Sequence, residues 1–140
     1  MNGTLKGTYE HILDTKGRMA FPQKLREKIG SSFIITIGQG CLLAYSTDEW
    51  DKFTDSMRGL KDGKARAAKR IVNLAADADC DPQGRIGINK ELQAYAGLTK
   101  NVTVVGVINH AEIWDSDKYR EFCNSVTQDD IDELLSDFAF

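Results

Sequence analysis

One stretch of this chain occurs twice. Asp14-Thr15-Lys16-Gly17-Arg18-Met19-Ala20-Phe21 recurs 67 positions later as Asp81-Pro82-Gln83-Gly84-Arg85-Ile86-Gly87-Ile88. The register holds without a gap as far as Gly30 and Gly97, and continues beyond them with one or two inserted residues. Two halves of about 67 residues would each bury little apolar surface alone. We therefore expect them to pack on each other about a pseudo-two-fold axis as one domain.

Each half is predicted to contain the same elements in the same order, namely two short strands around a turn, a short helix ending in glycine, a β-hairpin and a helix. In the first half the strands are expected at 8–13, 18–21, 33–37 and 41–45, and the helices at 22–29 and from 47. The second half is expected to have a long Ala-rich helix at 63–76, strands at 85–88, 102–107 and 112–114, and helices at 90–96 and after an N-cap at Ser116.

The expected organisation is one domain over 1–140, with a first half at 1–62 and a second half with a linking helix at 63–127. Residues 128–140 form an acidic tail that is predicted to be an amphipathic helix. Its apolar stripe consists of Ile131, Leu134, Leu135 and Phe138. Such a stripe needs cover, which we expect from the domain or from a neighbouring subunit.

The composition is that of a globular protein, with 41% apolar and 28% charged residues, which excludes disordered and collagen-like classes. No apolar run approaches the roughly 18 residues that span a bilayer, and the N-terminus has no apolar signal-peptide region. The three cysteines lack a CxxC spacing, so neither a disulfide framework nor a zinc site is expected. The expected location is the reducing cytoplasm.

The net charge of −3 conceals an uneven distribution. Five of the 21 acidic residues and no basic residue lie after Gln128, which leaves 16 acidic and 18 basic residues in 1–127. This part is only mildly basic, so a single subunit is expected to bind DNA weakly. The basic cluster at 61–70 has three open interpretations: a solvated face, a phosphate contact, or a partner for the acidic tail of the same or a neighbouring subunit.

The repeated D-x-x-x-R pattern predicts a tight turn flanked by two charges. Gly17 and Gly84 can adopt the positive φ that such a turn requires. The aspartate can accept hydrogen bonds from turn amides or pair with the arginine. Two interpretations remain open at this point. The motif is either a turn-stabilising ion pair without a ligand, or a carboxylate that positions a guanidinium at the surface for one.

Longer motifs in this sequence allow a more specific comparison with known proteins. Residues 7–27 fit the pattern G-x-Y-E-H-x-L-D-x-K-G-R-x-A-x-P-x-K-L-R-E. They are followed, in order, by Gly40-Cys41-Leu42-Leu43-Ala44-Tyr45, Asp48-Glu49-Trp50, Asp81-x-x-Gly84-Arg85, Ala96-Gly97-Leu98, Val105-Gly106 and Glu112-Ile113-Trp114. With these motifs the chain resembles the MraZ family of bacterial cell-division-operon regulators over essentially its whole length.

The resemblance implies an α+β fold in which two AbrB-like swapped-hairpin β-units form a small pseudo-two-fold β-barrel flanked by helices. It also implies ring-shaped homo-oligomers and sequence-specific binding to tandem promoter repeats of a cell-division and cell-wall operon, usually with repression. The expected partners are double-stranded promoter DNA and further copies of the chain, and the expected location is the cytoplasm, in association with the nucleoid. No cofactor, metal, membrane or small-molecule substrate is expected.

By position, Arg18 corresponds to the family's DNA-contacting arginine. Lys16 lies beside it, and Asp14 and Gly17 orient it. Arginine can donate two parallel hydrogen bonds to guanine, whereas lysine is better suited to phosphate. The equivalent residues of the second motif are Arg85, Asp81 and Gly84.

The second motif departs from the family pattern. Asn89 replaces an expected proline, Gln93 stands where the first half has Arg26, and Pro82-Gln83 replaces the basic Thr15-Lys16. A mainly structural role for Arg85 therefore stays open.

A rival interpretation comes from another class, a ring-forming protein-interaction module comparable to antitoxin partners, in which both turns are structural. No catalytic residue is expected, because His11 and His110 are the only histidines and no nucleophile has a nearby sequence partner. Cys41 and Cys80 are expected to fill the core. The glycines Gly38 and Gly40 precede a strand, which indicates a turn and not a phosphate-binding loop.

Overall fold

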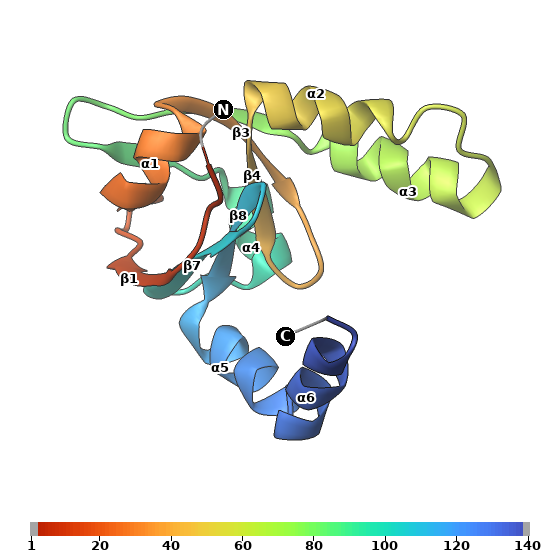
Figure 1. Ribbon diagram of the computed structural model, residues 1–140. Helices are drawn as coiled ribbons and strands as arrows, with labels where there is room; N and C mark the ends of the chain where they lie inside the picture. Colours follow the sequence, from red (N-terminus) through yellow and green to blue (C-terminus); the bar gives the residue numbers. More distant parts are fainter. Residues whose placement is uncertain (1–2, 139–140) are drawn as a thin grey trace.

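Antiparallel strands from both repeats interleave in this α+β fold (Figure 1), which is described here for residues 3–138 from a computed structural model. The first repeat provides β1 (Thr8–Ile12), β2 (Arg18–Ala20), α1 (Gln23–Ile29), β3 (Ser32–Ile37), β4 (Leu42–Ser46) and α2 (Thr47–Asp55). After α3 (Asp62–Asn73), the second provides β5 (Ala76–Asp79), β6 (Arg85–Gly87), α4 (Lys90–Ala96), β7 (Asn101–Val107), β8 (His110–Asp115) and α5 (Ser116–Ser125), followed by α6 (Gln128–Ser136).

The strand order shows how the repeats are related. One sheet has the order β1-β7-β8-β4-β3-β5, and β2 and β6 form a separate two-stranded ribbon. Exchanging the two repeats maps this order onto itself. The first strand of each repeat pairs with the hairpin of the other, β1 with β7 and β5 with β3. Neither half can therefore complete its own part of the sheet.

The closed β-barrel expected from the sequence is wrong. The sheet is open, because its end strands β1 and β5 pair with β7 and β3 and not with each other. The strands that could have bridged them, β2 and β6, are three residues long and pair as a separate ribbon. The ribbon lies against both end strands, β2 against β1 and β6 against β5, but forms no strand ladder with either in the described residues, so the sheet does not close.

The core lies where the ribbon and the short helices α1 and α4 meet the sheet. Leu25 and Ile29 of α1 are buried, as are Leu92 and Ala96 of α4. Each pair is spaced i,i+4 and so lies on one face of its helix. Phe21, after β2, packs its ring on Phe33 of β3 with 4.7 Å between centroids. The ribbon is thereby fixed against the sheet by both repeats.

Two sequence-based boundaries are wrong. The helix expected at 63–76 ends at Asn73, and residues 76–79 form the unpredicted strand β5. Pairing with β3 outweighs the helix propensity of the alanines in this stretch. The N-cap of α5 is Asp115 and not Ser116, because an Asp115 carboxylate oxygen accepts from the backbone N–H of Lys118. Ser116 is buried instead, with its Oγ 2.8 Å from Thr103 Oγ1.

Two helical arms extend from this core at different ends of the molecule (Figure 1). One arm consists of α2 and α3, and the other of α5 and α6. Trp50 of α2 packs near Tyr45 of β4, and Trp114 of β8 packs near Tyr119 of α5, so aromatic side chains hold each arm to the sheet. No helix within residues 3–138 is both long and apolar enough to cross a membrane.

Candidate nucleic-acid interface

Both D-x-x-x-R stretches form the same aspartate-capped turn. Asp14 Oδ1 accepts hydrogen bonds from the backbone N–H groups of Lys16 and Arg18, each at 2.9 Å. Asp81 makes the two equivalent bonds in the second repeat, also at 2.9 Å. One carboxylate oxygen thus fixes the backbone on both sides of the turn glycine. The turn sets the direction in which each arginine leaves the ribbon.

The same hydrogen bonds determine the ionisation of these carboxyl groups. The backbone N–H of Arg18 holds the pKa of Asp14 below its ordinary value, with smaller contributions from Lys16 and from the positive charges of Arg18 and Arg85. The pKa of Asp81 is lowered in the same way, first by the backbone N–H of Arg85. Hydrogen bonds to the ionised form favour that form. Both aspartates are therefore carboxylates at neutral pH.

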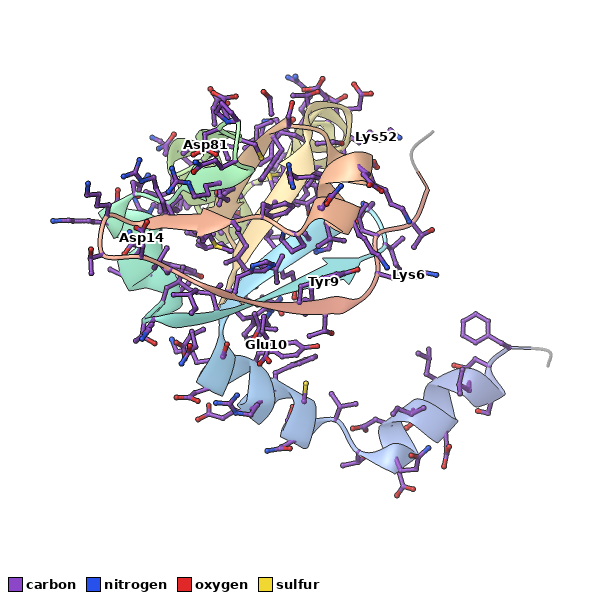
Figure 2. All side chains as sticks on the ribbon, turned by 90° about the vertical axis from the view of Figure 1, so that its left-hand side faces the viewer. Lys6, Tyr9, Glu10, Asp14, Lys52 and Asp81 are labelled. Carbon is purple, nitrogen blue, oxygen red and sulfur yellow. The ribbon has the colours of Figure 1, made fainter. Side chains whose placement is uncertain are left out.

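The ribbon connects the two turns but places them at its opposite ends, because β2 and β6 are antiparallel and each turn directly precedes its own strand. Arg18 pairs with Gly87 across β2 and β6. The carbonyl oxygen of each turn glycine accepts a hydrogen bond from the other repeat, at 2.8 Å for Gly17 from Ile88 and at 3.0 Å for Gly84 from Phe21. Both turns lie at the left-hand side of Figure 1, and Asp14 and Asp81 are labelled on them in Figure 2. Each repeat therefore contributes one candidate turn, and each turn is held by a hydrogen bond from the other repeat.

Gly17 sits in a space that a side chain cannot enter. Its φ is +76°, and an added Cβ would lie 2.6 Å from Gln93 Nε2 and 2.9 Å from the carbonyl oxygen of Ile88. Gln93 Nε2 donates to that same carbonyl at 2.6 Å. The amide of Gln93, from α4, therefore covers the turn of the first repeat.

Gly84, with a φ of +80°, is covered in the equivalent way. An added Cβ there would lie 2.8 Å from Cζ of Arg26, whose Nε donates to the carbonyl oxygen of Phe21 at 3.2 Å. Arg26 and Gln93 were not predicted to support the turns, although they hold equivalent positions in the two repeats. The available signal was that equivalence: a long polar residue eight positions after each motif arginine.

The two motif arginines differ in what their side chains contact. Arg85 Nε lies 3.0 Å from Asp81 Oδ2, and the Arg85 side chain is 37% exposed. Arg18 is also half-buried, but within residues 3–138 its guanidinium forms no ion pair with Asp14 or any other carboxylate. Lys16, beside it, is exposed. The first turn thus presents a cation without a carboxylate partner, and the second presents one whose Nε is already bonded to a carboxylate.

The remaining residues considered from the sequence are not part of these turns, although Cys80 directly precedes Asp81. His110 contacts Asn109 Oδ1 at 2.9 Å through Nδ1 and stacks on Tyr45 with 5.1 Å between centroids. Cys41 is buried, and burial raises the pKa of its thiol to about 12. Cys80 is half-buried. In the described part of the chain no group of three or more His, Cys, Asp or Glu side chains is arranged to hold a metal ion.

The repeat that shapes this site is also visible in comparison with known families. A family model described as MraZ protein, antitoxin-like, matches residues 4–71 and 73–136. Each match contains one aspartate-capped turn, at Asp14–Arg18 in the first and at Asp81–Arg85 in the second. Since the two matches together span nearly the whole sequence, the chain belongs to the MraZ family.

Proposed function

We propose that this protein is a sequence-specific DNA-binding regulator that represses a bacterial cell-division and cell-wall operon. It binds tandem promoter repeats as a ring of identical subunits, through AbrB-like units formed by the two repeats, and works in the cytoplasm in association with the nucleoid. The observation that carries this proposal is the half-exposed Arg18 guanidinium, which has no carboxylate partner in residues 3–138 and stands on a rigid turn next to exposed Lys16.

The chemistry of DNA recognition fits these groups. A guanidinium can donate two parallel hydrogen bonds to O6 and N7 of guanine, which is worth about 1–3 kcal/mol of discrimination against other bases. A lysine ammonium suits phosphate, which positions the protein without reading sequence. One subunit offers few such groups. A ring repeats them at fixed spacing, and linked sites can raise avidity by about 10²–10⁴.

Arg85 has a secondary part in this proposal. Its ion pair with Asp81 is partly exposed, and solvent screening makes such pairs contribute little to stability. DNA can therefore compete for the guanidinium, but part of the binding energy is spent in breaking the pair. We expect the second turn to discriminate bases more weakly than the first.

The test is binding of fluorescent promoter DNA by the wild type, Arg18→Ala and Arg85→Ala over a series of salt concentrations. Arg18→Ala is expected to lose at least about tenfold in affinity, with a smaller loss for Arg85→Ala. Lys16→Ala is expected to weaken binding to all sequences alike and to reduce the salt slope by about 1 per contacted phosphate. Arg120→Ala, on α5, is the matched control that removes an exposed arginine elsewhere, and it is expected to bind like the wild type. Wild-type affinity in a folded Arg18→Ala variant would contradict the proposal.

The closed Asp81–Arg85 pair favours a second candidate, an antitoxin-like ring that binds another protein and uses both turns structurally. The same experiment separates the two. A DNA-binding regulator shows affinity for promoter DNA that falls steeply with salt. A protein-binding ring shows no preference for promoter over unrelated DNA, and Arg18→Ala leaves its weak binding unchanged.

A further inference from the structure

The arm formed by α2 and α3 carries an open apolar groove. The groove has a volume of 510 Å³, and its apolar lining comes from Trp50, Met57, Ala65, Ala68 and Val72. Val72 is 45% exposed, and neither helix contains a fully buried residue. Ala65 and Ala68 are small and lie one turn apart on α3, so a further helix can approach closely. The groove is thus shaped to accept a helix with an apolar stripe.

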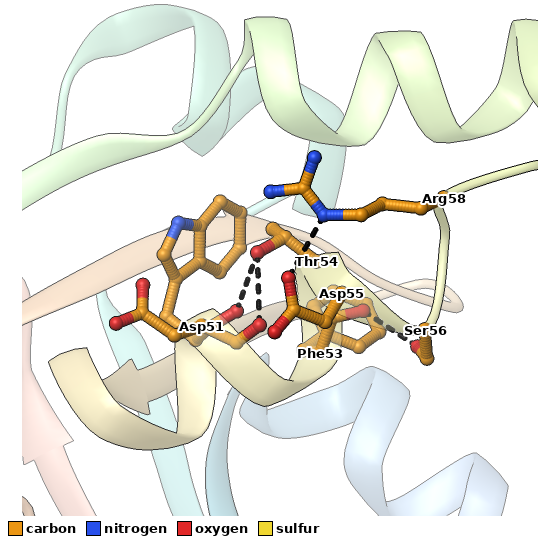
Figure 3. Close-up of polar contacts among 7 residues, drawn as sticks. Asp51, Phe53, Thr54, Asp55, Ser56 and Arg58 are labelled. Atoms are coloured by element: carbon orange, nitrogen blue, oxygen red, sulfur yellow. Dashed lines mark hydrogen bonds and ion pairs between the residues drawn. The ribbon is translucent and has the colours of Figure 1, made fainter.

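Figure 3 shows the polar contacts at the end of α2, next to this groove, with the Arg58 side chain lying between α2 and α3. Thr54 Oγ1 donates to the carbonyl oxygen of Trp50 at 3.0 Å, and Ser56 Oγ donates to that of Phe53 at 2.6 Å. These hydroxyls are satisfied within their own helix. Arg58 Nε donates to Asp55 Oδ1 at 2.9 Å, while its terminal guanidinium nitrogens have no partner in residues 3–138. The rim therefore offers donors to an acidic partner.

The second arm carries a matching surface. Every residue from 121 to 138 is exposed, including Ile131, Leu134 and Leu135, at 43%, 59% and 45%. The helix α6 has nine residues and begins with a capping box formed by Thr127 and Asp130. Helices this short are marginal in water without packing. An apolar stripe on such a helix indicates a contact surface.

The two arms have opposite charge. Residues 58–73, which include α3, contain six basic residues and one acidic residue. Residues 128–140 contain five acidic residues and no basic residue. Asp132 of α6 and the C-cap residue Asp137 flank the apolar stripe on its two sides, while Asp129 and Glu133 lie on the opposite face, given 100° per residue. Docking the stripe in the groove would place one flanking carboxylate along each edge of the groove, whose lining includes Arg58 after α2 and Lys69 on α3.

We propose that α6 of one copy of the chain docks in the α2–α3 groove of the next copy. The two arms lie at different ends of one molecule (Figure 1), so the contact forms between copies. Such a contact joins two different surfaces, head to tail, and therefore closes into a ring or continues as a filament. This inference deepens the proposed function, because it identifies the contact that builds the ring, and it rests on the homo-oligomeric part of that proposal.

Charge reversal with mixing tests the contact without DNA present. The α6 variant carries Asp132→Lys and Asp137→Lys, and the groove variant carries Arg58→Glu and Lys69→Glu. Native mass spectrometry and light scattering are expected to show a ring for the wild type and smaller species for each variant alone. In an equimolar mixture every α6–groove contact can again join opposite charges, in alternating copies. The mixture is therefore expected to recover the mass of the wild-type ring.

An α6 variant with Asp129→Lys and Glu133→Lys is the matched control, because it makes the same charge change on the far face of the helix. It is expected to keep the wild-type mass. Leu134→Ser is expected to raise the subunit concentration at half-assembly by at least about tenfold, through lost apolar burial. The docking proposal is overturned by a monomeric wild type, by variants of unchanged mass, by a mixture that stays dissociated, or by equal dissociation of the far-face control.

Two further outcomes separate this contact from other roles. If the groove variant keeps its mass but loses promoter DNA, the groove binds DNA and the docking proposal is wrong. If the wild type forms the ring and the mixture recovers it, yet promoter DNA does not bind, the proposed function fails and the docking contact stands. Arg18→Ala is expected to keep the ring mass, because the turns lie outside this contact.

Discussion

Replacing Gly17 with alanine should destabilise the fold far more than the same change at a glycine with equal backbone strain. Gly17 has a φ of +76°, and placing an L-residue there costs about 1–2 kcal/mol. The new Cβ would also lie 2.9 Å from the Ile88 carbonyl oxygen, which belongs to the backbone and cannot rotate away. It would in addition displace Gln93 from its hydrogen bond to that oxygen.

The size of the effect follows from these contacts. Crowding in a packed site typically costs about 1–3 kcal/mol, and a lost hydrogen bond about 1 kcal/mol. Added to the backbone strain, Gly17→Ala should cost about 3–6 kcal/mol. Gly59 is the matched control, since its φ is +81° and an added Cβ would meet nothing within 4 Å. Gly59→Ala should therefore cost only the strain of about 1–2 kcal/mol.

The assay is urea unfolding followed by circular dichroism, at one fixed subunit concentration because assembly contributes to stability. In a Gln93→Ala background the penalty of Gly17→Ala should shrink, since the side-chain part of the clash is removed. It should still exceed that of Gly59→Ala, because the Ile88 carbonyl remains. Equal penalties at the two glycines would refute the idea that close approach by the second repeat constrains this turn.

Three further predictions concern single groups. Asp14→Ala should lower the urea midpoint at pH 7, and this difference should narrow as the pH falls below about 4, because a depressed carboxyl pKa stabilises the fold only while the group is ionised. Thr103→Val should cost about 1–3 kcal/mol in urea unfolding by leaving the buried Ser116 hydroxyl unpaired, and adding Ser116→Ala should recover part of the loss. Alkylation and peptide mass mapping should find Cys123, which is exposed, modified rapidly in the folded protein, while Cys41, with its thiol pKa raised to about 12, reacts only after unfolding.

The features of the fold that depend on a few neighbouring residues were predicted correctly from local sequence patterns. The two turns, the starts of α2 at Thr47 and α4 at Lys90, and the glycine Gly97 that ends α4 all lie where the sequence indicated. Capping and turn geometry depend on a few consecutive residues, so a single sequence carries the necessary information. The buried residues of α1, Leu25 and Ile29, are four apart in the sequence, which is likewise a local pattern.

Features that depend on distant pairing were missed. The stretch Ala76–Asp79 has no β-branched or aromatic residue, and it becomes a strand because β3 pairs with it. Its counterpart β1, in the other repeat, was the available signal for this strand. The closed barrel was wrong because sheet closure depends on which strands meet at the ends, and no local pattern reports that.

The candidate site was also predicted only in part. The motif residues were identified by their spacing, but the difference between Arg18 and Arg85 was not visible, since the same residue types stand at equivalent positions. The pairing of Arg85 with Asp81 depends on side-chain conformation in the folded state. The covering residues Gln93 and Arg26 act on the turn of the opposite repeat, so sequence proximity gave no reason to connect them with it.

The exchange of partners between the repeats has an evolutionary consequence. After a gene duplication, either copy is ordinarily free to drift while the other keeps the ancestral role. Here each copy provides the hydrogen-bond acceptors and the cover that the other needs. Surface charge can diverge between the copies, as it has at Lys16 and Gln83. Strand register cannot diverge in this way, because the first strand of each repeat pairs with the hairpin of the other. If either repeat were lost, the remaining one would lack the strand and the cover that its partner provides.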